Sequence, residues 1–148
     1  MTSIVVDANL AVYIALGAPK KLEGSVALFW EKAGSAESDI ELFAPRLWWS
    51  ETTSIVRAYE FQKAITQPEA ASALQILDSL RLSFVNESAE LSARALDWAR
   101  RLGQAKAYDA MYVASAENLG GELWTADERL ANSCRSLGLS WVHEVSEI

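Results

Sequence analysis

The chain has 148 residues, enough to bury a core without disulfide bonds or a structural metal, and we expect one domain over residues 1–148. Its 51% of hydrophobic and 22% of charged residues exclude a disordered chain, and no apolar run approaches the roughly 20 residues that cross a bilayer, so we expect a cytoplasmic protein with no membrane contact. The net charge of −7 argues against a protein that coats nucleic acid through many Lys and Arg contacts, but it is compatible with a carboxylate site that holds a cation.

The first predicted element is a strand over Ser3–Val6. Its apolar, β-branched residues show no polar alternation, which indicates a strand buried on both faces inside a parallel sheet. Asp7 follows directly, at the carboxyl end of the strand, where open α/β sheets bind their ligands. The next segment, Ala8–Gly17, contains helix formers and ends just before Pro19, so it predicts a helix.

The segment after Pro19 predicts a helix, a strand and a long helix. Apolar residues at helical spacing indicate a helix over Ser25–Ala33, and Ile40–Ala44 alternates as a strand does. Pro45 fits the first turn of the following helix, where its missing N–H is not needed. That helix is expected to run to about Ala64, and Glu51 lies in its early part.

A capping-box pattern marks the start of the next helix. The Thr66 side chain is expected to accept a hydrogen bond from a backbone N–H, while Glu69 reaches back toward the cap. Ala70, Leu74 and Leu77 share one face of this helix, and we expect that face to be buried.

A strand over Leu82–Val85 is followed by two more predicted helices. Ser88 caps the first of them, which extends to Gly103 and carries an apolar stripe at helical spacing: Leu91, Ala95, Trp98 and Leu102. The second covers Ala107–Leu119 and has a narrow face of small residues suited to packing on a sheet. Asp109 stands at its beginning.

The C-terminal part completes the alternation of strands and helices. Glu122–Thr125 predicts a strand, Asp127 begins a helix that ends at Gly138, and Ser140–Val145 predicts the last strand. Because the two kinds of element alternate along the whole chain, we expect an α/β fold with a central, mainly parallel β-sheet flanked by α-helices.

Four carboxylates occupy equivalent places, after strands or at the starts of helices: Asp7, Glu51, Asp109 and Asp127. In a parallel sheet, strand ends and the following helix starts lie on one edge, so these side chains can meet. Several carboxylates without His or Cys favour Mg²⁺ or Mn²⁺, which prefer oxygen ligands. Such a cation can activate water and stabilise charge on a phosphodiester, so phosphodiester hydrolysis follows most directly. The lone Cys134 and lone His143 offer neither a Cys-His pair nor a zinc site.

Each acid also has a purely structural interpretation. Acidic residues near helix starts interact favourably with the helix dipole, which suffices to explain Glu51 and Asp109 taken singly. Asp7 is placed to cap a helix, and in the pattern Thr125 to Glu128 the threonine is the expected cap, with Asp127 an ordinary first-turn residue. The matching context of all four weakens these interpretations.

Four segments, in the expected order along nearly the whole chain, resemble the PIN domain family and, in size and motif wording, its VapC-type toxins: Asp7–Asn9, Pro45–Glu51, Tyr108–Ala114 and Thr125–Leu130. The resemblance implies a single PIN-like domain with Mg²⁺ or Mn²⁺ bound by the four carboxylates for endoribonuclease cleavage. It implies supporting hydrogen bonds from Asn9 and Thr125. It also implies a homodimer, a cognate antitoxin that inhibits the enzyme, and a role as the toxin of a type II toxin-antitoxin system.

Two further features are open to functional interpretations. Lys106 lies just before Asp109, and Arg100 and Arg101 lie on the preceding predicted helix, so these cations are candidates to bind RNA phosphates, although exposed Lys and Arg need no special role. The adjacent Trp48–Trp49 pair is equally compatible with core packing and with an anchor for a second protomer or an antitoxin segment.

Two alternatives to a nuclease remain at this point. One is a catalytically silent PIN-fold module that binds RNA or protein, against which the retention of four like charges argues, because such a cluster is costly without a cation. The other is a phosphoryl-acceptor or phosphatase domain with Asp7 as nucleophile. Haloacid-dehalogenase-type enzymes usually place a second Asp two residues after the first, and this chain has Asn9 there.

Overall fold

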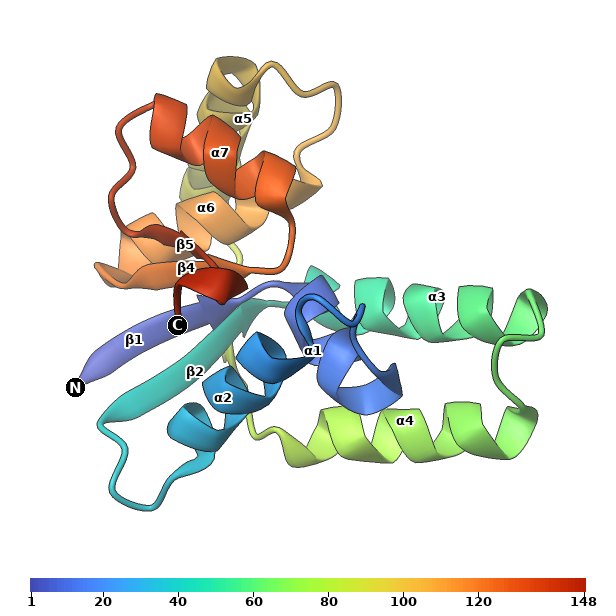
Figure 1. Cartoon of the computed structure of the whole chain (residues 1–148). Coiled ribbons are helices and arrows are strands. Elements are labelled where there is room, and N and C mark those ends of the chain that lie inside the picture. Colours follow the sequence, from blue (N-terminus) through green and yellow to red (C-terminus); the bar gives the residue numbers. More distant parts are fainter.

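A five-stranded parallel sheet forms the centre of the protein in the computed structural model, which describes residues 1–148 (Figure 1). The strand order is β3-β2-β1-β4-β5, and every neighbouring pair is parallel, which confirms the expected α/β class. The strands are β1 Thr2–Val6, β2 Ile40–Pro45, β3 Ser83–Val85, β4 Glu122–Thr125 and β5 Val142–Glu144.

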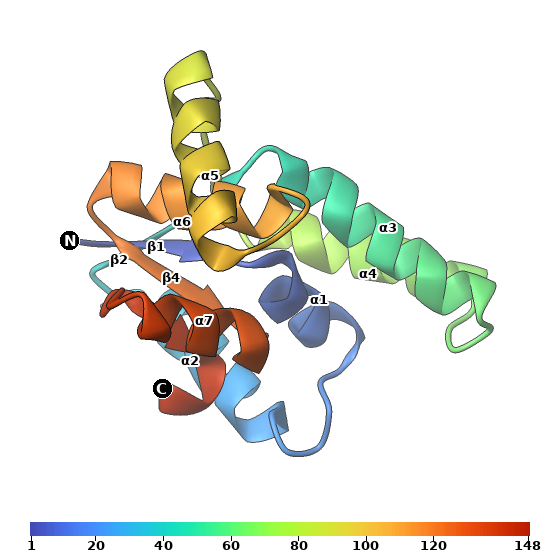
Figure 2. The same cartoon turned by 90° about the horizontal axis from the view of Figure 1, so that it is seen from above.

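Seven α-helices and a terminal 3₁₀ turn surround the sheet. They are α1 Ala8–Leu16, α2 Glu23–Gly34, α3 Leu47–Phe61, α4 Gln67–Ser79, α5 Ala89–Leu102, α6 Tyr108–Leu119, α7 Glu128–Ser136 and η1 Val145–Glu147. In Figures 1 and 2, α3 and α4 lie side by side and extend away from the sheet. None of the helices combines the length and the apolar character that a membrane span requires.

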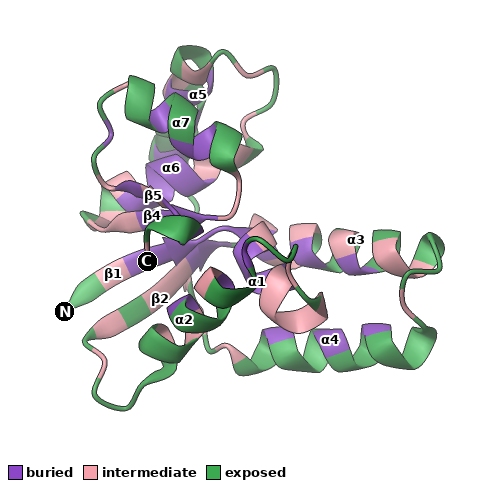
Figure 3. Cartoon of the chain, in the orientation of Figure 1, coloured by how far each residue is buried: buried purple, intermediate pink, exposed green.

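Strand β1 is buried on both faces, as its sequence predicts, because its alternate residues enter two different cores. Val5 belongs to a large core shared with α5, α6 and α7. Ile4 and Val6 belong to a smaller core with α1, α2 and η1. Figure 3 shows the buried residues gathered on the central strands and on the helix faces turned toward them. Asp7 is therefore the first polar residue after the buried run Ile4–Val6 of β1.

The long helix α3 is shorter at both ends than the predicted Pro45–Ala64. Pro45 is the last residue of β2 and pairs with Val85, and a strand end tolerates a residue without an N–H. The helix ends at Phe61 because Lys63 adopts a left-handed conformation, with φ of 60°, and the Ala64 N–H bonds back to the Tyr59 carbonyl. This is the usual six-to-one closure of a helix, made here without the glycine that marks it in a sequence.

The buried face of α4 differs from the predicted one. Ala73 lies with Ala70 and Leu77 in the core, whereas Leu74 is 38% exposed. Thr66 caps the helix as predicted and accepts the Glu69 N–H, but the Glu69 carboxylate accepts from the Thr66 hydroxyl and does not reach the backbone.

The last strand is also shorter than the predicted Ser140–Val145. Only Val142–Glu144 pair with β4, because the Glu144 carboxylate caps the turn η1 that begins at Val145.

Candidate functional site

The predicted acidic residues lie around the carboxyl edge of the sheet. Asp7 follows β1, and its backbone N–H donates to the Trp124 carbonyl at 3.0 Å, so β1 and β4 place Asp7 beside Thr125. Glu51 lies in the second turn of α3, Asp109 in the first turn of α6 and Asp127 at the cap of α7. Three helices and one strand end therefore supply the four carboxylates.

A hydrogen-bond network holds the Asp7 carboxylate. The Thr125 hydroxyl donates to Asp7 Oδ2 at 2.8 Å, and it accepts from Asn9 Nδ2 at 3.3 Å and from the Asp127 N–H at 3.0 Å. Asn9 Nδ2 also approaches Asp7 Oδ2 at 3.5 Å, while its Oδ1 accepts the Ala126 N–H at 3.0 Å. Asn9 and Thr125 thus tie the ends of two neighbouring strands to one acid.

The carboxylates destabilise one another's ionised forms. The pKa of Asp7 is raised to about 7, mainly by burial and further by the nearby Asp109 and Glu51, with the Thr125 hydrogen bond opposing the shift. The pKa of Glu51 is raised by burial and by Asp109, and that of Asp109 by burial and by Asp127. None of the four forms an ion pair with a Lys or Arg of the chain. The negative charge at this edge is not compensated by the protein itself.

Asp127 has a structural function that differs from the expected one. Its Oδ1 accepts the N–H groups of Arg129 and Leu130 at 2.9 and 3.2 Å, so Asp127 itself caps α7. The expectation that Thr125 is this cap is wrong, because its hydroxyl is already engaged with Asp7 and Asn9. The capping bonds use only Oδ1 of Asp127.

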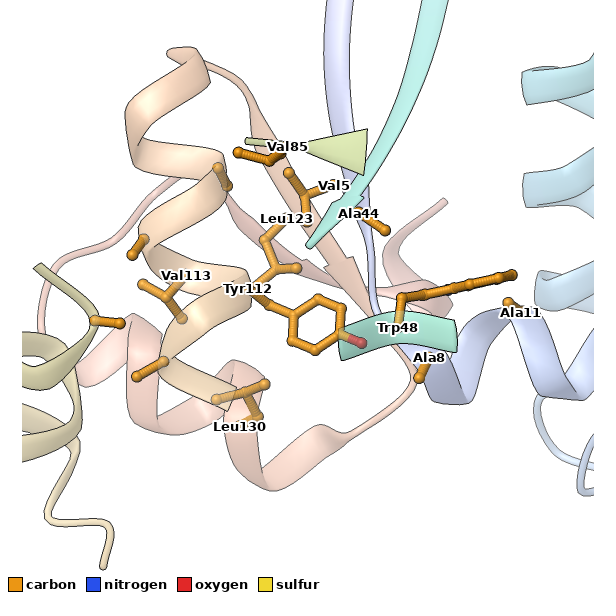
Figure 4. Packing of buried hydrophobic residues seen from close by; sticks show 14 of the residues in the cluster. Val5, Ala8, Ala11, Ala44, Trp48, Val85, Tyr112, Val113, Leu123 and Leu130 are labelled. Carbon is orange, nitrogen blue, oxygen red and sulfur yellow. The ribbon is translucent and has the colours of Figure 1, made fainter. Parts of the chain in front are cut away.

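Two polar residues that the sequence did not suggest hold the other acids. The Tyr112 hydroxyl donates to Glu51 Oε1 at 2.7 Å, and Gln104 Nε2 donates to Asp109 Oδ2 at 3.0 Å. Tyr112 is fully buried, and burial together with the nearby Asp7 and Glu51 raises the pKa of its phenol. Figure 4 shows its ring leaving α6 with the hydroxyl directed toward the start of α3. The sequence held one sign of this role: Tyr112 comes three residues after Asp109, and residues at that spacing share a helix face.

The donor set suits a hard divalent cation, although it is not a preformed cage. All the candidate ligands are carboxylate oxygens. The pKa values of Asp7, Glu51 and Asp109 are raised, first by burial and then by neighbouring acids. No three Asp, Glu, His or Cys side chains lie close enough together to hold one ion. Mg²⁺ is usually bound through one or two carboxylates and several waters, so the residues fit an ion held partly through water.

Surface hollows adjoin three of the four acids. A hollow of about 660 Å³ includes Asn9, Tyr13 and Asp127 in its wall. A second, of about 380 Å³, includes Asp109 and again Asp127, and a third of about 380 Å³ places Glu51 beside the exposed Tyr108. Asp7 is only 6% exposed and lines none of the three hollows.

The other candidates occupy different places. Arg100, Arg101 and Lys106 are exposed, none of them lines the three hollows, and the Arg101 guanidinium lies 4.2 Å from the centre of the Trp98 ring. Trp48 is fully buried and packs edge-on against the half-buried Trp49, with ring centres 4.9 Å apart. Trp48 is therefore a core residue and not an exposed anchor.

The chain was compared with protein-family models, with curated proteins and with solved structures. The family model described as PIN domain matches residues 4–135. The fold is similar to PAE2754 from Pyrobaculum aerophilum, with a TM-score of 0.65 and 18% identity over 99% of this chain and 91% of that one. It is also similar to FitAcB from Neisseria gonorrhoeae, with a TM-score of 0.64 and 16% identity over 98% and 99% of the two chains.

A third similar structure is VapBC2 from Rickettsia felis bound to a DNA fragment from its promoter, with a TM-score of 0.62 and 14% identity over 96% of this chain and 98% of that one. At such low identities these likenesses establish the fold alone. No curated protein shows significant sequence similarity to the chain.

Proposed function

Because the chain belongs to the PIN domain family, we propose that it is a Mg²⁺- or Mn²⁺-dependent endoribonuclease that hydrolyses RNA phosphodiester bonds. Asp7, Glu51, Asp109 and Asp127 are the proposed metal-binding and catalytic residues. The observation that supports this most directly is the uncompensated charge at the sheet edge: these acids have no Lys or Arg partner, and three of them have raised pKa values. Such a cluster is stabilised by a cation from outside the chain.

The protein residues around the acids orient them for that cation. A bound divalent ion would lower the pKa of water and offset the charge of the phosphodiester. Thr125 and Asn9 hold Asp7, Tyr112 holds Glu51 and Gln104 holds Asp109, so each side chain presents a defined oxygen. Lys106, Arg100 and Arg101 are proposed as more distant contacts to RNA phosphates.

The biological setting is part of the same proposal. The similar VapBC2 and FitAcB structures are toxin-antitoxin assemblies, which supports a cognate antitoxin as partner and a role as the toxin of a type II system. A homodimer, a single domain over residues 1–148 and a cytoplasmic location, where RNA is accessible, complete the proposal.

One observation favours a second candidate, a catalytically silent PIN-fold module that binds RNA or protein. No three acids lie close enough together to coordinate one ion. If this arrangement persisted in the presence of metal, the acids would serve recognition or helix capping, as Asp127 already does for α7.

Cleavage of a pool of structured RNAs by the purified protein in Mg²⁺, Mn²⁺ or EDTA tests the proposal. Asp7→Asn and Asp109→Asn are expected to abolish metal-dependent cleavage while the protein stays folded. Asp78→Asn, which changes an exposed acid of α4, is the matched control and is expected to cleave normally. Cleavage that persists in EDTA or in both site variants would contradict the proposal. Absent cleavage together with no heat of Mn²⁺ binding would favour the silent module.

A further inference from the structure

We propose that the 660 Å³ hollow beside the acidic site is a nucleotide subsite: it takes one unpaired nucleotide of the RNA strand next to the bond to be cut, with the base against Tyr13 and the adjoining phosphate contacted by Lys21 and Arg129. The inference rests on the proposed nuclease function. It assigns to three residues outside the acidic cluster a function in choosing and holding the substrate.

The position and size of the hollow suit a nucleotide. It is formed by α1, the segment between α1 and α2, the turn from β4 to α7, and η1. Figure 2 shows α1 and α7 on the same side of the sheet edge. Its volume lies within the range of about 300–1,000 Å³ that is typical of small-molecule sites. It shares Asp127 and Arg129 with the hollow that contains Asp109. A strand that crosses the acids therefore continues directly into it.

The cations of the hollow are free to bind an anion. Lys21 and Arg129 are exposed, and neither forms an ion pair, whereas Arg57, Arg94 and Arg135 are each paired with a carboxylate. Three acids line the same hollow: Asp127 caps α7, Glu144 caps η1, and Glu128 is exposed in the first turn of α7, where it interacts favourably with the helix dipole. Unpaired cations at the boundary of a site that acts on phosphodiesters are placed to neutralise phosphate charge.

The hollow also offers a surface for a base. Tyr13 is half-buried in its wall, one helical turn after Asn9, whose amide bonds to Thr125 and Asp7. A base stacked on this ring would therefore lie one turn of α1 away from the carboxylate network. Stacking on an aromatic ring requires an unpaired base, which a strand in a duplex does not offer.

Binding of a short single-stranded RNA of mixed sequence, measured by fluorescence anisotropy, tests the subsite. The Asp109→Asn protein in Mg²⁺ is the background, because it is expected to bind without cutting. In it, Lys21→Ala and Arg129→Ala should each weaken binding about fivefold and reduce the slope of log K against log salt by about 0.7. Tyr13→Leu should weaken binding about tenfold, and Tyr13→Phe should restore it to within about twofold, because the ring is kept.

Lys32→Ala is the matched control, since Lys32 is an exposed cation on α2 that does not line the hollow, and it should leave affinity and salt slope unchanged. In the otherwise unchanged enzyme, the hollow variants should raise the KM for RNA cleavage by the same factors and leave kcat unaltered. Thermal melts of each variant exclude unfolding as the cause.

The outcomes separate this inference from the function on which it rests. If the unchanged enzyme cuts RNA while the hollow variants behave like Lys32→Ala, the subsite is overturned and the nuclease stands. The subsite is likewise overturned if the variants lower kcat alone, or if double-stranded RNA binds as tightly as single-stranded RNA. If the protein neither binds nor cuts any RNA, both proposals fail, and the hollow is then a site for a protein segment or for no ligand.

Discussion

Asp7 is a carboxylic acid that the fold buries among other acids, so its ionisation costs folding free energy in the metal-free protein. Its pKa is about 7 in the folded chain, against an unperturbed value of 3.8. The folded state therefore holds a proton that the unfolded state has lost, and stability falls as pH rises between these two values.

Asp7→Asn should accordingly stabilise the metal-free protein by about 2–4 kcal/mol above neutral pH, because it removes that ionisation cost. The difference should vanish only near about pH 3, below the unperturbed pKa of 3.8, where the acid is mostly protonated in both states. Urea unfolding in EDTA at several pH values measures it, and Asp78→Asn should show no such trend. If the Asp7→Asn protein were less stable than the original chain at high pH, ionised Asp7 would not be a cost to the folded state.

At this scale the sequence predicted which acids lie near the sheet edge, and it did not predict what holds them. Asp7 and Thr125 end neighbouring strands, so parallel topology alone brings them together. Tyr112 and Gln104 depend on the rotation of α6 and on the course of the loop before it. Tyr112 in particular lies among apolar residues of α6, where a core tyrosine and a site tyrosine have the same sequence pattern.

At the scale of elements, the pairing of β1 with β4 depends on a glycine. A methyl group on Gly121 would lie 2.2 Å from the Ser3 carbonyl oxygen, so no other residue allows the strands to approach in this register. The same pairing places Asp7 beside Thr125.

Gly121→Ala should therefore destabilise the protein by about 3 kcal/mol and lower the midpoint of thermal unfolding by roughly 9 °C. Gly24→Ala in the first turn of α2 is the control, since its methyl group meets nothing within 4 Å. That variant should gain about 0.5–1 kcal/mol from higher helix propensity. Equal unfolding midpoints for the two variants would contradict the close approach of β1 and β4.

Element types and order followed from periodicity, whereas several boundaries did not. Burial on both faces made β1 recognisable from three consecutive apolar residues, and Thr66 and Ser88 marked their helix starts through capping bonds. The end of α3 was missed because its left-handed residue is Lys63 and not a glycine. Its start was missed because Pro45 is as acceptable at a strand end as in a first helical turn. Leu74 was misplaced because the helix α4 packs through the small Ala73.

At the scale of the whole molecule, the net charge of −7 and the site acids without ion pairs lead us to expect that divalent cations stabilise the folded protein. A cation that binds the folded state alone stabilises it by about 2.7 kcal/mol at a hundredfold excess over its Kd. We expect Mn²⁺ to raise the unfolding midpoint by roughly 8 °C at about pH 8. Asp7→Asn should lose this shift, and Asp78→Asn should keep it.

Acid should weaken both metal binding and cleavage. Below its pKa of about 7, Asp7 carries a proton that the cation must displace, so Mn²⁺ affinity and activity should fall as pH drops through neutrality. Calorimetric titrations in buffers of different ionisation enthalpy measure the released proton. An affinity that stays constant down to about pH 5 would show that Asp7 does not contact the ion.

The hydrogen bonds of the four acids also affect how many oxygens each acid can offer to a cation. In each carboxylate one oxygen is already engaged: Asp7 Oδ2 with Thr125, Glu51 Oε1 with Tyr112, Asp109 Oδ2 with Gln104, and Asp127 Oδ1 with backbone N–H groups. The second oxygen of each accepts no hydrogen bond from another side chain. An oxygen that already accepts a hydrogen bond has less capacity left for a cation, so we expect each acid to contact the ion mainly through its other oxygen. Such contacts match the octahedral, water-rich shell of Mg²⁺ better than the larger shell of Ca²⁺, which often takes both oxygens of a carboxylate.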